Sequence, residues 1–308
     1  MKQYKAYKII SIAIIVFIVS SSMFISAQQP GMAFLRLSAD AAGAARGGAL
    51  TASGTGLSAV HWNPAGLAEN NGHQIYISHI KGFEDTNSEY AGLLWKRNDR
   101  QTFALTLLSN NIEGIEFRTK PTEEPEGNIS AHDLYAGVSF AYKYRQDIHI
   151  GLSAKYLYQK IYLYDATGFA GDLGVRYIPE GKPYKAGIAL RNIGSMQAMR
   201  SEKTEMPALM RAGATYTFTL DEKDFRSIEV SGDYEVIFDG DNHTYLGVDF
   251  RQESTYHISF GYVNGYDTGR FSYGGGVSVG KYGFDYAYLP EITSFGNQHI
   301  LTLRLLFN

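Results

Sequence analysis

The sequence contains no cysteine. This absence excludes a disulfide framework, a thiol nucleophile and a cysteine-ligated metal centre. Basic residues are not in excess either, because 28 lysines and arginines face 31 aspartates and glutamates, a formal net charge of -3. The chain lacks the charge pattern of nucleic-acid-binding proteins, so we expect no nucleic-acid partner. Proline is scarce (8 residues) while glycine (33) and tyrosine (23) are abundant, which excludes collagen, coiled coils and disordered chains.

Long apolar runs are missing after residue 30, where no stretch approaches the roughly 18 uncharged residues of a transmembrane helix. The marked apolar run before that point is Ile9 to Val19, which follows three lysines and leads to small and polar residues ending at Ala27. This is the pattern of a secretory signal peptide. We therefore predict that residues 1–27 are a signal peptide that is removed on export, with an uncleaved N-terminal helix as the alternative.

From Gln74 to the C-terminus, short alternating segments follow one another, separated by turn residues. Most have close to the 9 to 11 residues that cross a bilayer as a tilted strand. We therefore predict an all-β fold, a transmembrane antiparallel β-barrel of about 14 strands over residues 73–308. The expected strands are 74–81, 88–97, 101–110, 131–144, 148–160, 168–178, 184–193, 208–219, 227–238, 243–251, 255–263, 270–279, 283–289 and 298–307.

The alternation within these segments indicates which side of a strand meets lipid. In 255–263, one face carries Tyr256, Ile258, Phe260 and Tyr262, and the other carries His257, Ser259 and Gly261. A soluble β-sandwich would alternate in the same way. The signal peptide, the even strand count and the many tyrosines at strand ends favour a barrel in the outer membrane of a Gram-negative bacterium, in contact with outer-membrane lipid.

Two long polar connections, 111–130 and 194–207, fall at the same end of the predicted barrel, whereas the turns at the other end are short. Outer-membrane barrels have short periplasmic turns and longer outer loops, so both long connections are expected outside the cell. They are candidate docking loops for a protein partner. The candidate docking residues are Glu116, Arg118, Lys120, Glu123, Glu124, Arg200 and Lys203.

A barrel of about 14 strands is wider than its own side chains can fill, so something must close the lumen. The Ala/Gly-rich segment 28–72 is the candidate plug, because small residues allow close backbone packing; a flexible periplasmic leader is the alternative. Within it, Asn63, Pro64, Ala65 and Gly66 form a predicted turn. This turn either closes the plug or acts as a hinge or constriction that shifts to open a path.

Catalytic patterns are weak. Gly276 to Gly280 matches GxSxG, but this motif requires a sharp strand-to-helix turn and here lies in an alternating strand. His257 and Ser259 have the spacing of a base and nucleophile, yet both face the predicted lumen. The eight histidines show no metal-ligand spacing. We predict a protein that is not an enzyme and has no catalytic residues, no metal site and no cofactor.

Several motifs carry a family resemblance. The run Ala39 to Ala49 (ADAAGAARGGA), followed by His61 to Ala68 (HWNPAGLA), resembles the N-terminal signature of FadL-like barrels. The resemblance is closer to the PorV/PorQ family of Bacteroidetes-type bacteria. Leu190 to Gly194 resembles an internal strand end of that family, and Phe284 to Tyr288 with Gly296 to His299 resembles its closing hairpin.

This resemblance implies a 14-stranded barrel with an N-terminal plug and leaves two roles open. PorV-like proteins serve type IX secretion, binding secreted cargo proteins and passing them to surface-attachment machinery. FadL-like proteins pass hydrophobic small molecules through the plug and a lateral opening in the wall. We expect the secretion role first and passive transport as its alternative, with a structural or adhesive barrel as a third possibility. The chain departs from the family pattern in ending Phe307-Asn308 and in having outer loops shorter than those expected of a dedicated fatty-acid transporter.

Overall fold

The computed structural model describes residues 31–70, 72–82, 86–121, 123–200, 202–221, 226–238, 240–252, 255–266, 269–290 and 296–307. The predicted signal peptide, residues 1–27, lies outside these ranges. No helix in the described part of the chain is long and apolar enough to cross a membrane.

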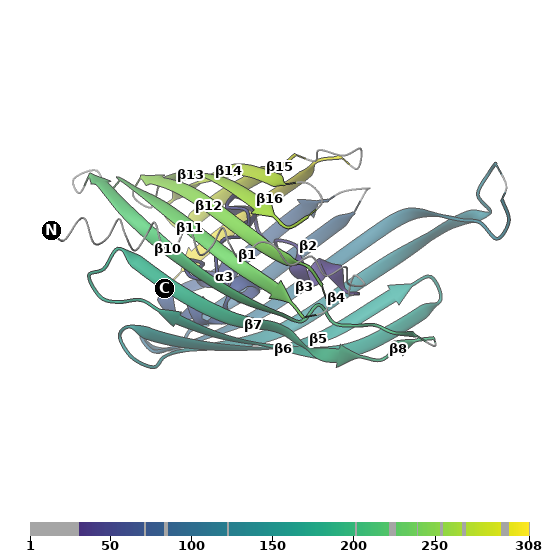
Figure 1. Cartoon of the computed structure of the whole chain (residues 1–308), viewed down its shortest axis with the longest axis horizontal. Coiled ribbons are helices and arrows are strands. Elements are labelled where there is room, and N and C mark those ends of the chain that lie inside the picture. Colours follow the sequence, from purple (N-terminus) through teal and green to yellow (C-terminus); the bar gives the residue numbers. More distant parts are fainter. Residues whose placement is uncertain are drawn as a thin grey trace.

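The described strands form a closed antiparallel barrel of 14 strands, which confirms the predicted fold class (Figure 1). The barrel closes because β1 pairs with β16 over its whole length, from His73 opposite Phe307 to Lys81 opposite His299. The wall strands are β1 (His73–Lys81), β2 (Asn87–Lys96), β3 (Gln101–Phe117), β4 (Gly127–Lys143), β5 (Ile148–Ile161), β6 (Tyr164–Tyr177), β7 (Tyr184–Met196), β10 (Leu209–Asp221), β11 (Arg226–Ile237), β12 (Asn242–Gln252), β13 (Tyr256–Asn264), β14 (Arg270–Val279), β15 (Tyr282–Leu289) and β16 (Gln298–Phe307).

The predicted loop 111–130 is largely a β-ribbon instead. β3 and β4 continue to pair as far as Phe117 opposite Gly127, and this ribbon projects well beyond the other strands (Figure 1). A register shift between Ile112 and Ile115 explains how the pairing survives, because Gly114 adopts the left-handed conformation (φ 75°) that a bulge needs. The predicted strand ends were therefore wrong here, although the strands themselves are correct.

The second long connection also contains short strands, β8 (Ala198–Met199) and β9 (Glu202–Lys203), which pair as a small separate sheet. We call the end of the barrel that carries this connection and the ribbon the outer end, following the orientation of outer-membrane barrels. The opposite end, with the short turns, is the inner end.

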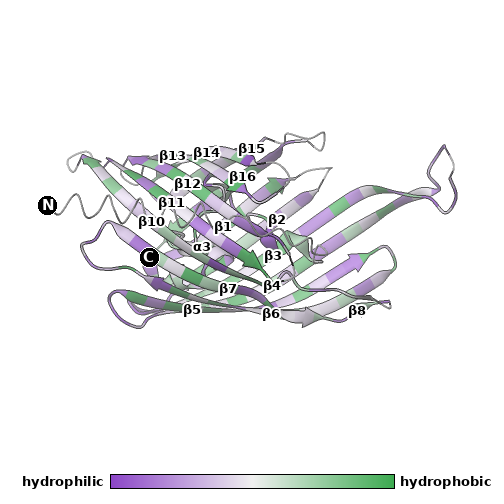
Figure 2. Ribbon diagram, in the orientation of Figure 1, coloured by the Kyte–Doolittle hydropathy of each residue, from purple (hydrophilic) through white to green (hydrophobic). Residues whose placement is uncertain are grey.

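Side chains alternate across the wall as predicted. On β13, Ile258 is 49% exposed and Phe260 is 55% exposed on the outside of the barrel, whereas Ser259 is fully buried inside. Figure 2 shows the same change of hydropathy along many of the wall strands. The outer surface is therefore an apolar belt suited to lipid, and the core lies within the lumen.

Residues 31–70 lie inside the barrel, and we call them the plug. They form the short helices η1 (Ala33–Arg36), α2 (Ala41–Ala45), α3 (Gly56–Trp62) and η2 (Pro64–Glu69). The Asp40 side chain begins α2 by accepting a hydrogen bond from the Gly43 amide (2.7 Å). Small residues allow close packing: a Cβ on Gly47 would lie 2.9 Å from the Tyr262 amide nitrogen of the wall. Residues 31–70 therefore lie within the lumen and pack closely against its wall.

Candidate functional site: the plugged lumen

The predicted turn Asn63 to Gly66 joins α3 to η2 and lies against the wall. The Asn63 carboxamide oxygen accepts a hydrogen bond from the Ala65 amide (3.1 Å). Its Nδ2 atom donates to the Thr51 carbonyl (2.9 Å) within the plug and to the Val175 carbonyl (3.2 Å) of β6. Pro64 occupies the first position of η2, where its fixed φ suits a helix start. One asparagine therefore links two parts of the plug to the wall.

Three wall glycines make room for this turn. A Cβ on Gly174 of β6 would lie 2.0 Å from Asn63 Oδ1, and one on Gly151 of β5 would lie 2.2 Å from the Ala65 nitrogen. A Cβ on Gly187 of β7 would lie 2.4 Å from the Thr51 carbonyl oxygen. These distances are far below normal contact, so only glycine permits the approach. We call these three positions the glycine recess.

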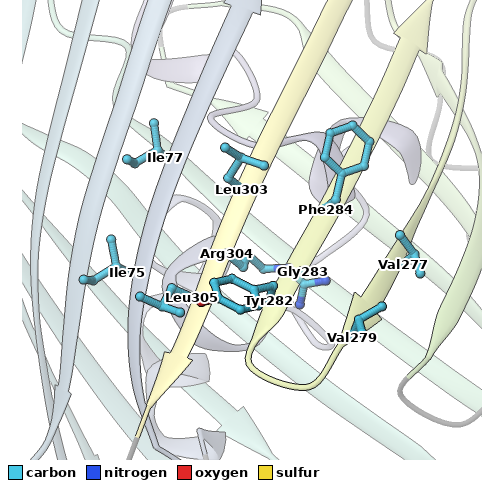
Figure 3. Close-up of a pocket in the computed structure, with 10 residues that line it drawn as sticks. All are labelled: Ile75, Ile77, Val277, Val279, Tyr282, Gly283, Phe284, Leu303, Arg304 and Leu305. Atoms are coloured by element: carbon cyan, nitrogen blue, oxygen red, sulfur yellow. The ribbon is translucent and has the colours of Figure 1, made fainter.

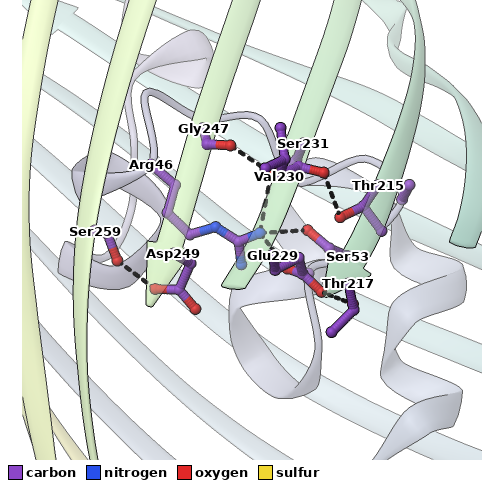
Figure 4. Close-up of polar contacts among 12 residues, drawn as sticks. Arg46, Ser53, Thr215, Thr217, Glu229, Val230, Ser231, Gly247, Asp249 and Ser259 are labelled. Carbon is purple, nitrogen blue, oxygen red and sulfur yellow. Dashed lines mark hydrogen bonds and ion pairs between the residues drawn. The ribbon is translucent and has the colours of Figure 1, made fainter. Parts of the chain in front are cut away.

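The plug is fixed by ion pairs on the side of β10 to β12. Arg46, which follows α2, pairs with Glu229 of β11 and donates hydrogen bonds to Ser53 (2.9 Å) and Ser231 (3.1 Å) (Figure 4). In the same view, Ser259 Oγ of β13 donates a hydrogen bond to Asp249 of β12 (2.5 Å). We call the charged lumen side chains of β10, β11 and β12 the charged wall.

Arg211 of β10 forms the centre of the charged wall. Its Nε lies 3.2 Å from Asp233 of β11, and its Nη2 donates to the Gly48 carbonyl of the plug (2.8 Å). Its guanidinium lies between two rings, 3.6 Å from the centroid of Tyr245 and 4.9 Å from that of Trp62. Arg211 is almost fully buried, so these partners must compensate for the hydration that its positive charge has lost.

A second ion-pair group holds the end of the plug. Arg176 of β6 pairs with Glu69 (2.7 Å) and donates to the Gly54 carbonyl (2.5 Å). Lys185 of β7 lies 2.7 Å from the other oxygen of Glu69. Glu69 is the last residue of η2, so the plug is tied down just before the chain enters β1.

The other side of the plug packs into an apolar cluster. This cluster runs through the lumen along β1 to β7, from Met196 near the outer end to Leu94 near the inner end. We call it the apolar cluster. Its members are Met32, Phe34, Leu35, Ala39, Leu57, Val60, Leu67, Ala68, Tyr76, Tyr90, Leu94, Ala104, Leu108, Tyr135, Ala141, Leu157, Ala166, Ala170, Met196 and Met206, with Met199 packed against them.

The segment 204–208 closes the outer end of the apolar cluster. Met206 is 7% exposed and belongs to the cluster, and the Pro207 carbonyl accepts a hydrogen bond from Asn192 Nδ2 (3.3 Å). This segment also meets the start of the plug, because a Cβ on Gly31 would lie 3.8 Å from the Cβ of Thr204. We call residues 204–208 the outer strap.

The wall is incomplete where the outer strap lies. The pairing of β7 with β10 stops at Arg191 opposite Leu209, although β7 continues to Met196. Asn192 adopts a left-handed conformation (φ 56°) that turns β7 away from β10. A buried ion pair holds this bend, since Lys155 Nζ lies 2.7 Å from Asp172 and donates to Asn192 Oδ1 (2.9 Å). From Asn192 toward the outer end, β7 and β10 are no longer hydrogen-bonded to each other, and the outer strap lies beside β7 instead.

Burial shifts the pKa values of two plug side chains, His61 and Asp40. Burial, reinforced by the positive charge of Arg191, holds the pKa of His61 well below its usual value, so the imidazole is neutral near pH 7. Its Nε2 lies 3.3 Å from Arg191 Nη2, where a neutral ring nitrogen accepts a hydrogen bond. Burial raises the pKa of Asp40, although the Gly43 amide favours its charged form.

The hydrolase-like residues do not form a catalytic site. Ser259 donates to Asp249 rather than to a histidine, and His257 lies 3.5 Å from Asp285. The Gly276 to Gly280 motif lies at the end of β14 and in the turn that follows, with no helix after it. In the described part of the chain, Ser259 has no hydrogen bond to a histidine that could act as its general base.

The candidate docking residues lie on two separate elements. Glu116 lies near the end of β3 and pairs with Arg118 (2.9 Å), while Lys120, Glu123 and Glu124 lie at the tip of the ribbon. The other two lie in the small sheet region: Lys203 belongs to β9, and the Arg200 guanidinium stacks over Tyr164 (5.3 Å). Their role in docking stays a prediction.

An apolar groove of about 370 Å³ lies on the outside of the barrel, over β14, β15, β16 and β1 (Figure 3). Ile77, Leu303 and Phe284 line it, and all three belong to the lipid-facing side of their strands. These three side chains make the groove part of the apolar surface that faces lipid.

These features define a class of protein, a plugged outer-membrane-type β-barrel that is FadL-like in fold. No family model and no curated protein matches the sequence. Among solved structures, the toluene transporter TodX of P. putida has a TM-score of 0.66 with 13% identity, covering 88% of this chain and 99% of that one. The CymD monoaromatic hydrocarbon channel has a TM-score of 0.65 with 12% identity, covering 88% and 98%. The toluene transporter TbuX of Ralstonia pickettii has a TM-score of 0.63 with 13% identity, covering 87% and 98%.

Proposed function

We propose that this protein carries uncharged hydrophobic small molecules across the outer membrane without catalysis. The observation that carries the proposal is the apolar cluster, which spans the lumen from Met206 to Leu94 on one side of the plug. An apolar solute that passes there exchanges one apolar surface for another, so no polar group has to lose its hydration. The similar structures include toluene transporters and a monoaromatic hydrocarbon channel, which favours this role over secretion.

The outer strap is the element that must move. It covers the outer end of the apolar cluster and also fills the incomplete wall between β7 and β10. Few wall hydrogen bonds hold it, chiefly Asn192 Nδ2 to the Pro207 carbonyl and the Phe238 amide to the Ala208 carbonyl (3.0 Å). Segments with few such bonds open at low cost. Entry to the cluster thus requires the strap to separate from the start of the plug.

A disulfide tests this directly, because the chain has no cysteine to interfere. The variant Gly31→Cys/Thr204→Cys has a Cβ separation of 3.8 Å, which is within the range of native disulfides. We expect the oxidised variant to lose uptake of radiolabelled toluene by cells that lack other hydrocarbon transporters, and reductant to restore it.

The control is Gly82→Cys/Thr86→Cys, which links the ends of the β1–β2 turn with a Cβ separation of 3.3 Å. Both positions lie at the outer end, but away from the strap. Oxidation of the control should leave uptake unchanged. Absence of toluene uptake in the wild type would contradict the function itself, whereas uptake through the fully oxidised Gly31–Thr204 variant would contradict the role of the strap.

A secretion role remains a second proposal, carried by the projecting ribbon. The last β3 residue paired with β2 is Asn111, and the β4 edge is bonded as far as Ser130, whose carbonyl accepts a hydrogen bond from the Tyr162 amide (3.2 Å). Beyond these points, the described residues of the ribbon pair only with each other. Free strand edges accept an extended segment of another protein. Cargo or secretion-machinery subunits would dock there, and a Bacteroidetes-type source would agree with this role.

A further inference from the structure

A second cavity lies at the outer mouth, on the opposite side of η1 from the apolar cluster. It has a volume of about 80 Å³ and lies between the plug and the wall strands β12 to β16. Arg36, Tyr266 and Arg270 contribute its polar wall, and Trp62 and Phe271 contribute apolar surface. Pockets that enclose a whole drug-sized ligand are about 300–1,000 Å³, so this cavity has room for a small polar group rather than a whole hydrophobic ligand.

Both arginines have unused hydrogen-bonding capacity. The Nε atoms of Arg36 and Arg270 are buried, and neither has a hydrogen-bond partner in the described part of the chain. The Arg270 guanidinium stacks on the Tyr266 ring, 4.1 Å from its centroid. Arg36 Nη2 lies 3.5 Å from both Tyr266 Oη and His243 Nδ1. Tyr266 thus lies between the two cations and holds them toward one cavity.

Glu235, the carboxylate near Arg36, is already engaged elsewhere. It lies 3.7 Å from Arg36 but also 3.6 Å from Arg211, and it accepts a hydrogen bond from Tyr245 (2.8 Å). The single Glu235 carboxylate is therefore shared among Arg36, Arg211 and Tyr245. The two guanidiniums at the cavity are left with positive charge that no described carboxylate fully neutralises.

We propose that this cavity binds the carboxylate group of a small organic anion. Planar guanidiniums match a carboxylate in shape and donate two hydrogen bonds to it, and the buried Nε atoms supply donors that now lack acceptors. Tyr266 and Trp62 provide ring surface for an aromatic or unsaturated body that extends into the mouth. The ligand differs in charge from the neutral compounds of the proposed function, and the site lies apart from the apolar cluster.

The test uses the whole protein in lipid nanodiscs, with benzoate as the charged probe and benzyl alcohol as a neutral compound of similar size. Binding is measured by equilibrium dialysis. We expect benzoate to bind, and Arg270→Gln and Arg36→Gln each to weaken it about tenfold, the loss expected for one charge-assisted hydrogen bond. Arg270→Lys, which keeps the charge but loses the planar donor pair, should fall between Arg270→Gln and the wild type.

The matched control is Arg251→Gln. Arg251 also belongs to the charged wall, but it lies near the inner end of β12, where it pairs with Asp249. Its loss should leave benzoate binding unchanged, and benzyl alcohol should bind equally to every variant. Each variant is first checked for the heat-dependent shift in gel mobility of a folded barrel.

Three results would overturn the proposal: no benzoate binding by the wild type, equal binding by the wild type and Arg270→Gln, or an equal loss in Arg251→Gln. None of these depends on toluene uptake, so failure of this site and failure of the proposed transport are separate outcomes.

Discussion

At the scale of single residues, Asn63 illustrates how the plug is held without covalent links. Its side chain makes hydrogen bonds to the Thr51 and Val175 carbonyls and to the Ala65 amide, within a recess that needs glycine at three wall positions. A buried amide with all its partners is expensive to disturb, because each lost partner leaves a desolvated polar group. This arrangement favours an anchor over a hinge for the turn Asn63 to Gly66.

Gly174→Ala should destabilise the protein by about 1 to 3 kcal/mol, the typical cost of overpacking, because the new methyl group would overlap Asn63 Oδ1. The control is Gly232→Ala on β11, where a Cβ would lie 3.5 Å from Leu246, an ordinary contact. The measurement is the temperature at which the folded barrel changes gel mobility. If the two variants melt alike, the recess does not hold the turn.

The double variant Gly174→Ala/Asn63→Ala extends this test. Removing the carboxamide removes the overlap, so part of the cost of Gly174→Ala should disappear in the Asn63→Ala background. A coupling between the two changes is expected for residues in contact and not for distant ones. If the two destabilisations simply add, the cost of Gly174→Ala does not come from its overlap with Asn63.

At the scale of elements, the sequence predicted most strands because lipid and lumen impose a period of two on every crossing strand. It did not predict the length of the ribbon, since one glycine, Gly114, allows pairing to continue through a charged stretch. The turn Asn63 to Gly66 was predicted from the residues of the turn itself, but the glycine recess that receives it was not predicted. Gly151, Gly174 and Gly187 are far from it in sequence and meet it only when the barrel closes, although three lumen-facing glycines on adjacent strands were a visible signal.

The same limit applies to the lumen. Charged residues such as Arg211 and Glu229 were visible in the strands, but alternation gives only the face of each residue. The division into a charged wall and an apolar cluster depends on which strands face which part of the plug. That is a property of the closed barrel, and local patterns do not contain it.

The ribbon should be removable as an element. Ile112 lies opposite Ala131, so residues 113–130 can be replaced by the two-residue turn Asn-Gly without changing the register. The deletion removes the stacking of Phe117 on Tyr162, whose ring centroids lie 5.5 Å apart, at a cost of about 1 kcal/mol. We expect the folded barrel and toluene uptake to persist, measured by gel mobility and by cell uptake.

This deletion also separates the two proposed roles. If the ribbon docks secreted proteins, the shortened chain should no longer bind a purified cargo protein that the wild type binds, while it keeps toluene uptake. Loss of uptake on deletion would instead make the ribbon part of the transport path, contrary to the path proposed through the apolar cluster.

At the scale of the whole molecule, the plug is held by two kinds of contact. Ion pairs bind Arg46 to β11 and Glu69 to β6 and β7, and apolar packing supports the plug along β1 to β7. Removing one partner of a buried ion pair costs several kcal/mol, whereas apolar contacts can be replaced by an apolar solute. Under the proposed transport role, the ion pairs would keep the plug in place while an apolar compound displaces apolar contacts.

Acid should loosen this closure. The pKa of His61 is lowered in the closed lumen, so a released plug binds more protons than a docked one once the pH falls below the ordinary histidine pKa of about 6.5. The stabilisation from neutral His61 is present above that pH and is lost below it. At pH 5.5 the docked state should lose about 1.4 kcal/mol, or tenfold in the equilibrium. Asp40, whose pKa is raised, acts in the opposite direction at lower pH.

The measurement is ion conductance of the purified protein in a planar bilayer between pH 7.5 and pH 5.5. Openings should become about tenfold more frequent across this range in the wild type. In His61→Gln, which keeps a polar acceptor beside Arg191 but cannot gain a proton near neutral pH, most of this increase should vanish. The same increase in both proteins would show that His61 does not set the pH response. A flat response in both would show that the plug stays docked through this range, because a released His61 would gain its proton.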